Sequence, residues 1–113
     1  MIEIYHNPRC SKSRQGIALL ESYGAPFKVV RYLDNTPNEK ELESLIDKLN
    51  IKPIELVRKN EAIWKSDFKS KDLTDSEIIS AMAQHPKLIE RPIVVKGRKA
   101  VIGRPTEKIS TLL

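Results

Sequence analysis

The first 33 residues carry the pattern that most restricts the fold of this chain: a short strand, a helix and a second strand joined by short connections. Apolar and polar side chains alternate over residues 2–5, as in a half-buried strand. Apolar residues then recur at helical spacing as far as Gly24, which predicts a helix with a glycine stop. Residues 27–33 are apolar and β-branched enough for a second strand. The two strands of such a unit run parallel, so the chain must form a sheet with at least one parallel pair.

Two helix-start signals organise the middle of the chain. Thr36-Pro37-Asn38-Glu39 has the form of a capping box with proline at the first helical position, which predicts a helix over residues 37–49 with Thr36 as its cap. Thr74-Asp75-Ser76-Glu77 repeats the signal and predicts a helix that ends near His85-Pro86, because the residue before a proline disfavours helix. A short helical turn is expected at residues 53–57 between them.

The last third returns to strands. Apolar runs on both sides of Gly97-Arg98 predict an antiparallel hairpin over residues 93–102, followed by a short helix that starts near Thr106. The element order is therefore β-α-β, a helical insertion at about 37–90, and β-β-α. That order predicts an α/β, thioredoxin-like fold in which helices flank a four-stranded mixed sheet, within a single domain over residues 1–113.

Cys10 is the only cysteine, so an internal disulfide is excluded, and the residue is a buried hydrophobe, an intermolecular partner or a reactive thiol. It stands between the first strand and the helix start, where the partial positive charge and free N–H groups of a helix N-terminus lower the pKa of a thiol. Arg9, Lys12 and Arg14 add positive charge nearby. We therefore predict a reactive thiolate. His6 in the same loop either tunes the thiol or transfers a proton, or it only caps the loop.

The spacing around Cys10 excludes several other thiol sites. Ser13 stands where a dithiol oxidoreductase carries its second cysteine, so a thiol from another molecule must release an oxidised or adducted Cys10. The C-x5-R loop of low-molecular-weight tyrosine phosphatases is absent, because Gly16 takes the place of the arginine. One cysteine with His6 and His85 offers too few ligands for zinc, so no metal site is predicted.

Charge is unevenly distributed along the sequence. The net charge is +5 overall, and the basic residues concentrate in the two ends, which flank an acidic middle. If the ends meet in the fold, positive charge gathers on one side and suits a small anion, a nucleic acid or an acidic protein. No nucleic-acid-binding module or interleaving of aromatic and basic residues occurs, so nucleic acid is not an expected partner. No apolar run is long enough for a membrane span and no signal-peptide pattern starts the chain, so we expect a cytoplasmic protein without a membrane partner.

Five segments of the chain, in this order and at near-constant spacing, resemble the ArsC family of glutaredoxin-coupled arsenate reductases. They are His6-Asn7-Pro8-Arg9-Cys10-Ser11-Lys12-Ser13-Arg14, Leu56-Val57-Arg58-Lys59-Asn60, His85-Pro86, Arg91-Pro92-Ile93-Val94-Val95 and Gly103-Arg104-Pro105-Thr106-Glu107.

The resemblance implies a set of site residues. It assigns to Cys10 the nucleophilic attack on arsenate, and it matches Arg58, Arg91 and Arg104 with the arginines that bind the oxyanion. Arginine suits that role because its planar fork binds oxyanions bidentately and keeps its charge at any working pH. The thioredoxin-like plan also places a proline, typically cis, facing the active thiol at the start of the third strand, and Pro92 holds that position.

The resemblance also implies the source of the electrons. No cofactor is expected to be bound. Glutathione is expected as co-substrate and glutaredoxin as the protein that takes the electrons onward, with arsenite as the product. Only the need for an external thiol follows from the cysteine count itself.

Two features leave alternatives open. Arg9 replaces a small residue of the well-known arsenate reductases, and Ser11-Lys12 replaces their usual Gly-Thr, which is also compatible with a thiol-dependent reductase for another substrate. The other alternative is an Spx-like regulator, which shares the fold and binds RNA polymerase. Such regulators generally carry a C-x-x-C switch, and Ser13 argues against one here.

Overall fold

The computed structural model describes all 113 residues, which form two compact units. Unit 1 comprises Met1–Asn35 and Arg91–Leu113, and unit 2 comprises Thr36–Glu90. The single domain over residues 1–113, with a helical insertion at about 37–90, stays a prediction. No helix in either unit is long and apolar enough to cross a membrane.

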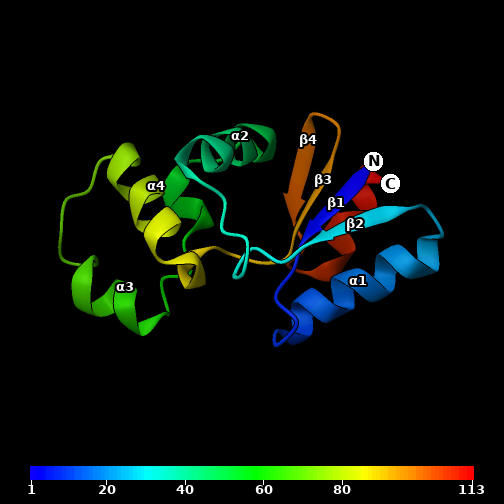
Figure 1. The fold of residues 1–113 in the computed structure, drawn as a ribbon, viewed down its shortest axis with the longest axis horizontal. Coiled ribbons are helices and arrows are strands. Elements are labelled where there is room, and N and C mark those ends of the chain that lie inside the picture. The colour runs from blue at the N-terminus through cyan, green and yellow to red at the C-terminus, as the bar shows by residue number, and fades with distance from the viewer. The chain divides into compact units, whose positions relative to one another are not determined.

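Unit 1 is a four-stranded mixed sheet with two helical segments. Its strands lie in the order β2-β1-β3-β4, with β1 parallel to β2 and antiparallel to β3, and with β3 antiparallel to β4 (Figure 1). The predicted thioredoxin-like fold class is therefore confirmed. The elements are β1 (Ile2–Tyr5), α1 (Ser11–Tyr23), β2 (Phe27–Val30), β3 (Ile93–Lys96), β4 (Lys99–Ile102) and the 3-10 helix η3 (Thr106–Leu112).

Local sequence explains most of these boundaries. Helix α1 ends at Gly24, which adopts the left-handed conformation with φ of 86° and donates its N–H to carbonyls of the last helical turn. Strand β2 is shorter than the predicted 27–33, because residues 31–35 form a turn in which the Arg31 carbonyl accepts from the N–H groups of Asp34 and Asn35. The hairpin turns at Gly97, with φ of 62°, as predicted.

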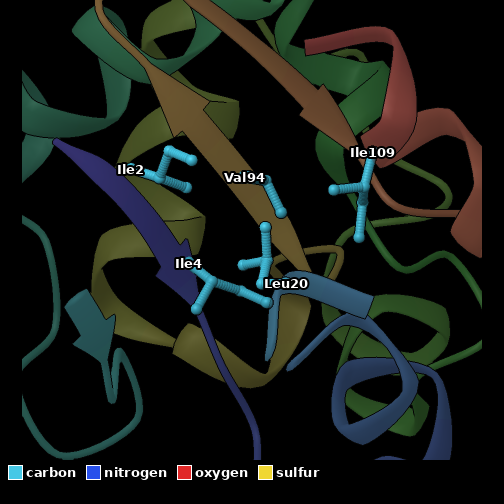
Figure 2. Close-up of a cluster of buried hydrophobic side chains, with 5 residues drawn as sticks. All are labelled: Ile2, Ile4, Leu20, Val94 and Ile109. Atoms are coloured by element: carbon cyan, nitrogen blue, oxygen red, sulfur yellow. The ribbon is translucent and has the colours of Figure 1, made fainter. Parts of the chain in front are cut away.

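The core of unit 1 lies between one face of the sheet and the helical segments. Ile2 and Ile4 of β1 point to the same face, as alternate strand residues do, and Val94 of β3 lies opposite Ile4 (Figure 2). Leu20 of α1 and Ile109 of η3 complete the cluster. Because η3 packs against both α1 and β4, the C-terminal segment becomes part of the same core as the N-terminal strand.

Two glycines allow especially close packing in this core. A Cβ atom at Gly16 of α1 would lie 3.1 Å from Cγ of Pro92, and a Cβ atom at Gly103 would lie 2.9 Å from Cδ1 of Ile109. Both glycines are buried. A larger residue at either position would therefore push on the proline that begins β3 or on the centre of the core.

Unit 2 consists of short helices around an apolar core. Helix α2 packs against α4, and an isolated antiparallel bridge joins Val57 to Ile89. Trp64 and Phe68 stack with ring centroids 5.7 Å apart. The elements are α2 (Glu39–Leu49), η1 (Pro53–Leu56), α3 (Ala62–Asp67), α4 (Asp75–Gln84) and η2 (Pro86–Leu88).

The predicted start of α2 is wrong by two residues. Asn38 is the cap: its side chain accepts from the N–H of Glu41 at 2.8 Å, and the Glu41 carboxylate accepts from the N–H of Asn38 at 3.1 Å. Asparagine caps helices as well as threonine does, and Asn38 with Glu41 forms a capping box that starts two residues after the predicted one. The capping box at Thr74 and the end of α4 before His85-Pro86 are confirmed.

We expect Gly103→Ala to lower the free energy of unfolding by ~1–3 kcal/mol, because its Cβ would crowd the fully buried Ile109. Ile109→Val removes the crowded Cδ1 atom and by itself should cost ~1 kcal/mol. The double variant should then lose less free energy of unfolding than the two single variants lose together, as measured by urea denaturation. Strictly additive losses would contradict the close packing.

Candidate active site

Cys10 is the N-terminal cap of α1, at the end of the loop that leaves β1. Its backbone is extended, with φ of −95° and ψ of 123°, and its carbonyl accepts the first helical hydrogen bond from the N–H of Arg14 at 3.0 Å. Its own N–H donates to the carbonyl of Asn7 at 3.0 Å, so the loop closes as a turn immediately before the helix. The residue is only 8% exposed.

The surroundings of the sulfur favour its ionised form. Burial by itself would raise the pKa of the Cys10 thiol, but N–H groups and positive charges outweigh it and hold the pKa below its ordinary value. In order of effect, these groups are the backbone N–H of Ser13, the charge of Arg91, the backbone N–H of Lys12 and the charge of Arg104. The helix start and two arginines distant in sequence therefore act together on one thiol.

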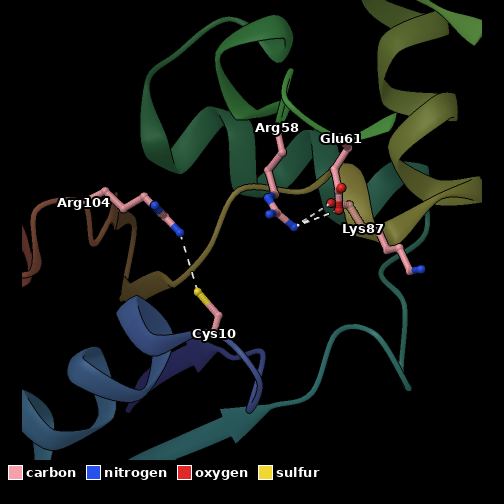
Figure 3. Close-up of polar contacts among 5 residues, drawn as sticks. All are labelled: Cys10, Arg58, Glu61, Lys87 and Arg104. Atoms are coloured by element: carbon pink, nitrogen blue, oxygen red, sulfur yellow. Dashed lines mark hydrogen bonds and ion pairs between the residues drawn. The ribbon is translucent and has the colours of Figure 1, made fainter. Parts of the chain in front are cut away.

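Arg104 is the arginine in direct contact with the thiol. Its Nη2 lies 3.6 Å from the sulfur of Cys10, across 94 residues of sequence (Figure 3). Its Nε donates to the carbonyl of Arg91 at 2.7 Å, and the neighbouring Gly103 N–H donates to the carbonyl of Pro92 at 2.9 Å. These two hydrogen bonds join the Arg91-Pro92 and Gly103-Arg104 segments, so the sequence-predicted residues Cys10, Arg91, Pro92 and Arg104 lie together in unit 1.

The peptide bonds of both arginine–proline pairs, Arg91-Pro92 and Arg104-Pro105, are cis. The expectation of a cis proline at the start of β3 therefore agrees with the structure. The second cis bond was not expected from the sequence.

His6 and Ser13 form a buried pair beneath the loop. Ser13 is fully buried, and its Oγ lies 2.7 Å from Nδ1 of His6 and accepts from the N–H of Asn7 at 3.0 Å. The side chain of His6 therefore has Ser13 as its hydrogen-bonding partner rather than the sulfur of Cys10. The serine in place of a second cysteine thus ties the loop to the first turn of α1.

Burial, with added repulsion from Arg31 and Arg14, lowers the pKa of His6 below its ordinary value. His6 is therefore neutral at neutral pH. The hydroxyl of Ser13 has one donor and two acceptor sites, so besides accepting from the Asn7 N–H it can either donate to Nδ1 of His6 or accept from it, and both neutral tautomers fit the contact. The tuning or proton-transfer role of His6 stays a prediction.

Asn7 is an organising residue to which the sequence interpretation gave no role. Its side-chain Oδ1 accepts from the N–H of Arg9 at 3.0 Å, and its backbone N–H and carbonyl contact Ser13 and Cys10. The preference of asparagine for such turns, with a proline next in the chain, is the signal that could have identified it. Arg14 supports the same loop, since its Nη1 donates to the carbonyl of Pro8 at 2.9 Å.

Arg58, the third predicted oxyanion ligand, belongs to unit 2. Its Nη1 forms an ion pair with Glu61 at 3.1 Å and donates to the carbonyl of Lys87 at 3.3 Å (Figure 3). Its backbone N–H donates to the carbonyl of Leu88 at 2.7 Å, which anchors the residue in unit 2. Binding of an oxyanion by Arg58 stays a prediction.

The fold and this site define a thioredoxin-like protein with one activated cysteine at a helix start. The family model for the ArsC family matches residues 5–112. An arsenate reductase of Neisseria meningitidis is 40% identical over 99% of this chain and 97% of its own length, and one of Haemophilus influenzae is 42% identical over 97% of each. The solved structure of an arsenate reductase from Vibrio cholerae superposes with a TM-score of 0.95 at 42% identity, covering 99% of this chain and 97% of that one. The chain belongs to the ArsC family.

We expect Arg104→Gln to raise the pKa of Cys10, because a positive charge beside the thiolate is lost. Alkylation by the neutral reagent iodoacetamide at neutral pH should slow by roughly fivefold and recover at alkaline pH. The pH–rate profile of alkylation measures this. Arg98→Gln is the matched control, since Arg98 is an exposed arginine at the hairpin turn, away from Cys10. An equal shift in both variants would contradict a specific effect of Arg104.

The lowered pKa of His6 predicts a pH dependence of stability. As the pH falls through the ordinary histidine pKa of 6.5, His6 becomes protonated in the unfolded chain but stays neutral in the folded chain. The free energy of unfolding therefore decreases. His6→Gln removes this term. Urea denaturation at about pH 7.5 and about pH 5.5 should show a larger loss for the wild type than for the variant. Equal losses would show that His6 does not titrate differently in the two states.

Proposed function

We propose that this protein reduces arsenate to arsenite, with Cys10 as the nucleophile. The observation that carries the proposal is the position of Arg104, 3.6 Å from a thiol whose pKa is lowered by helix N–H groups and by two arginines. A thiolate beside a guanidinium fork suits attack on a tetrahedral oxyanion. The ArsC membership and the arsenate reductases among the relatives support arsenate as that oxyanion.

The first step forms a sulfur–arsenic bond. The Cys10 thiolate attacks arsenic, and an arsenate oxygen leaves as water after it takes up a proton, which gives a cysteine–arsenate ester. Arsenic stays at oxidation state V in this step. The negatively charged oxygens would repel a thiolate, so Arg104 and Arg91 act by neutralising them as the ester forms.

The oxyanion site of the proposal contains three arginines. Arg91 and Arg104 supply it from unit 1, where their segments are hydrogen-bonded to each other. We assign the third place to Arg58, as the family resemblance implies. Arg58 would then exchange its contact with Glu61 for the oxyanion, or keep it and use its remaining N–H groups.

Reduction in the second stage needs two electrons, which two thiols supply when they are joined in one disulfide. The chain has one cysteine, so the thiols come from outside. We propose that glutathione attacks arsenic in the ester and displaces a second oxygen as water, which forms an arsenic–glutathione sulfur bond. A glutaredoxin thiol then attacks the glutathione sulfur to form a mixed disulfide, and the electron pair of the broken arsenic–sulfur bond reduces arsenic to oxidation state III. Water finally cleaves the bond between arsenic and Cys10, which releases arsenite and returns Cys10 as a thiol. No bound cofactor is required, and the cytoplasm is the compartment that supplies these thiols.

His6 has a positioning role in this proposal. Through Ser13 it holds the loop that carries Cys10 against the first turn of α1, so the Lys12 and Ser13 N–H groups stay directed at the sulfur. The ring nitrogen that is not bonded to Ser13 remains available to carry the proton that departs with water.

The proposal predicts that NADPH is oxidised only when arsenate is added to the protein with glutathione, glutaredoxin and glutathione reductase. Cys10→Ser should abolish this turnover, because the hydroxyl is not ionised at neutral pH. Ser22→Ala is the control, since Ser22 is exposed at the far end of α1 and the variant keeps Cys10 and its contacts. If saturating glutaredoxin gives no arsenate-dependent turnover in the wild type, the assignment fails, and another substrate for the same thiol becomes the better hypothesis.

Arg104→Lys separates oxyanion binding from thiol activation. Lysine keeps the positive charge near Cys10 but lacks the planar fork that binds two oxygens at once. We expect the KM for arsenate to rise by roughly tenfold, since a bidentate charged contact is lost. The pH–rate profile of Cys10 alkylation should change little. A pH–rate profile shifted to higher pH, with an unchanged KM for arsenate, would show that Arg104 acts only on the thiol.

A further inference from the structure

The charge of this protein is concentrated in the unit that carries the thiol. Unit 1 contains eleven Lys and Arg residues against four Asp and Glu, whereas unit 2 contains nine against eleven. Unit 1 therefore has a net charge of +7 and unit 2 of −2. Cys10 therefore lies in the unit that carries the positive net charge of the protein.

The cations around Cys10 fall into two groups. Arg91 and Arg104 are half-buried and act on the sulfur itself. Arg9 and Lys12 are exposed. They lie one and two positions from Cys10 in the chain, so their backbones are within a few ångströms of it. Their side chains make no hydrogen bond or ion pair, unlike Arg14, which is held at the Pro8 carbonyl. The first turn of α1 contains no acidic residue to neutralise them.

We propose that Arg9 and Lys12 select the thiol that releases Cys10, favouring small thiols that carry a carboxylate over neutral or cationic ones. The half-buried arginines serve the oxyanion, and the exposed pair serves the incoming reductant. This inference rests on the proposed function only in requiring an external thiol at Cys10. It adds a specificity that neither the cysteine count nor the oxyanion site provides.

The physical basis is attraction between an incoming carboxylate and two unpaired cations. Unit charges about 6 Å apart in water attract by less than 1 kcal/mol each, so two cations favour an anionic thiol by about threefold to tenfold at low salt. Because both side chains are exposed, salt screens the effect, and it should fade at about 0.5 M. A selectivity caused by shape or hydrophobic contact would not fade in this way.

The test measures the attack of an external thiol on Cys10 held as a mixed disulfide, in the absence of arsenate. Cys10 is converted to its thiopyridyl disulfide, and an added thiolate forms a disulfide with Cys10 while thiopyridine leaves with the displaced electron pair. The probes are mercaptoacetate, mercaptoethanol and cysteamine, which are anionic, neutral and cationic. Each rate is divided by the rate of the same thiol with the thiopyridyl disulfide of mercaptoethanol, which removes differences in intrinsic reactivity.

A matched control pair lies at the other end of the sheet. Residue Tyr5, which precedes the Cys10 loop, pairs with Ile93, whereas Ile2 pairs with Lys96 beside the hairpin turn. Arg98 and Lys99 are therefore one arginine and one lysine, both exposed, at the end of β3 and β4 away from Cys10. Arg98→Gln/Lys99→Gln changes the net charge as much as Arg9→Gln/Lys12→Gln does.

We expect the wild type to prefer mercaptoacetate over mercaptoethanol by about threefold to tenfold and to disfavour cysteamine. Arg9→Gln/Lys12→Gln should remove most of this preference, and Arg9→Glu/Lys12→Glu should reverse it in favour of cysteamine. The control variant Arg98→Gln/Lys99→Gln should leave the preference for mercaptoacetate nearly unchanged.

Three results would overturn the proposal: no charge preference in the wild type, a preference that survives Arg9→Gln/Lys12→Gln, or an equal loss in the control pair. The last would mean that the charge of the whole unit acts, and not these two residues. Because the assay contains no arsenate, its outcome is independent of whether the protein reduces arsenate. Failure of the NADPH-coupled arsenate assay would overturn the proposed function and leave the measured thiol selectivity in place.

Discussion

The site depends on keeping a thiolate stable in a nearly buried position. Burial raises the pKa of the Cys10 thiol, and fixed N–H groups and positive charges lower it again. The N–H groups of Ser13 and Lys12 come from the first turn of α1 and require only that Cys10 be its cap. The charges of Arg91 and Arg104 come from the other end of the chain and require the complete sheet of unit 1. Loss of either source would raise the pKa of the Cys10 thiol and so lower its reactivity at neutral pH.

The close core of unit 1 is what brings those charges to the thiol. Gly16 and Gly103 have no side chains, so α1 and the segment after β4 approach Pro92 and Ile109 closely. The Gly103 N–H and the Arg104 Nε then bond to the carbonyls of Pro92 and Arg91. A change in core packing at the glycines would therefore be transmitted to the guanidinium beside the sulfur, without any change in the residues that react.

Charge in unit 1 is divided by exposure. Half-buried arginines act strongly on the thiol because little water screens them, whereas the exposed Arg9 and Lys12 act on whatever approaches. His6 is kept neutral by burial and by the neighbouring Arg31 and Arg14, so it adds no further charge to the site. Its contact with Ser13 instead gives the loop a defined position, which explains how a chain without a second cysteine still uses that place in the sequence.

The sequence by itself determined the order of the strands and helices, most helix limits and the position of Cys10 at a helix start, because these depend on side-chain periodicity, capping residues and glycine stops within a few residues. It made β2 three residues too long, because a turn begins at Arg31. It misplaced the cap of α2, where Thr36 and Asn38 offer competing local hydrogen bonds of similar strength. It named Arg91 and Arg104 only through family resemblance, and it gave Asn7 no role. Tertiary structure alone decided that Arg104 touches Cys10 across 94 residues and that His6 bonds Ser13. Such contacts depend on the path of the whole chain and on core packing, which local patterns do not encode.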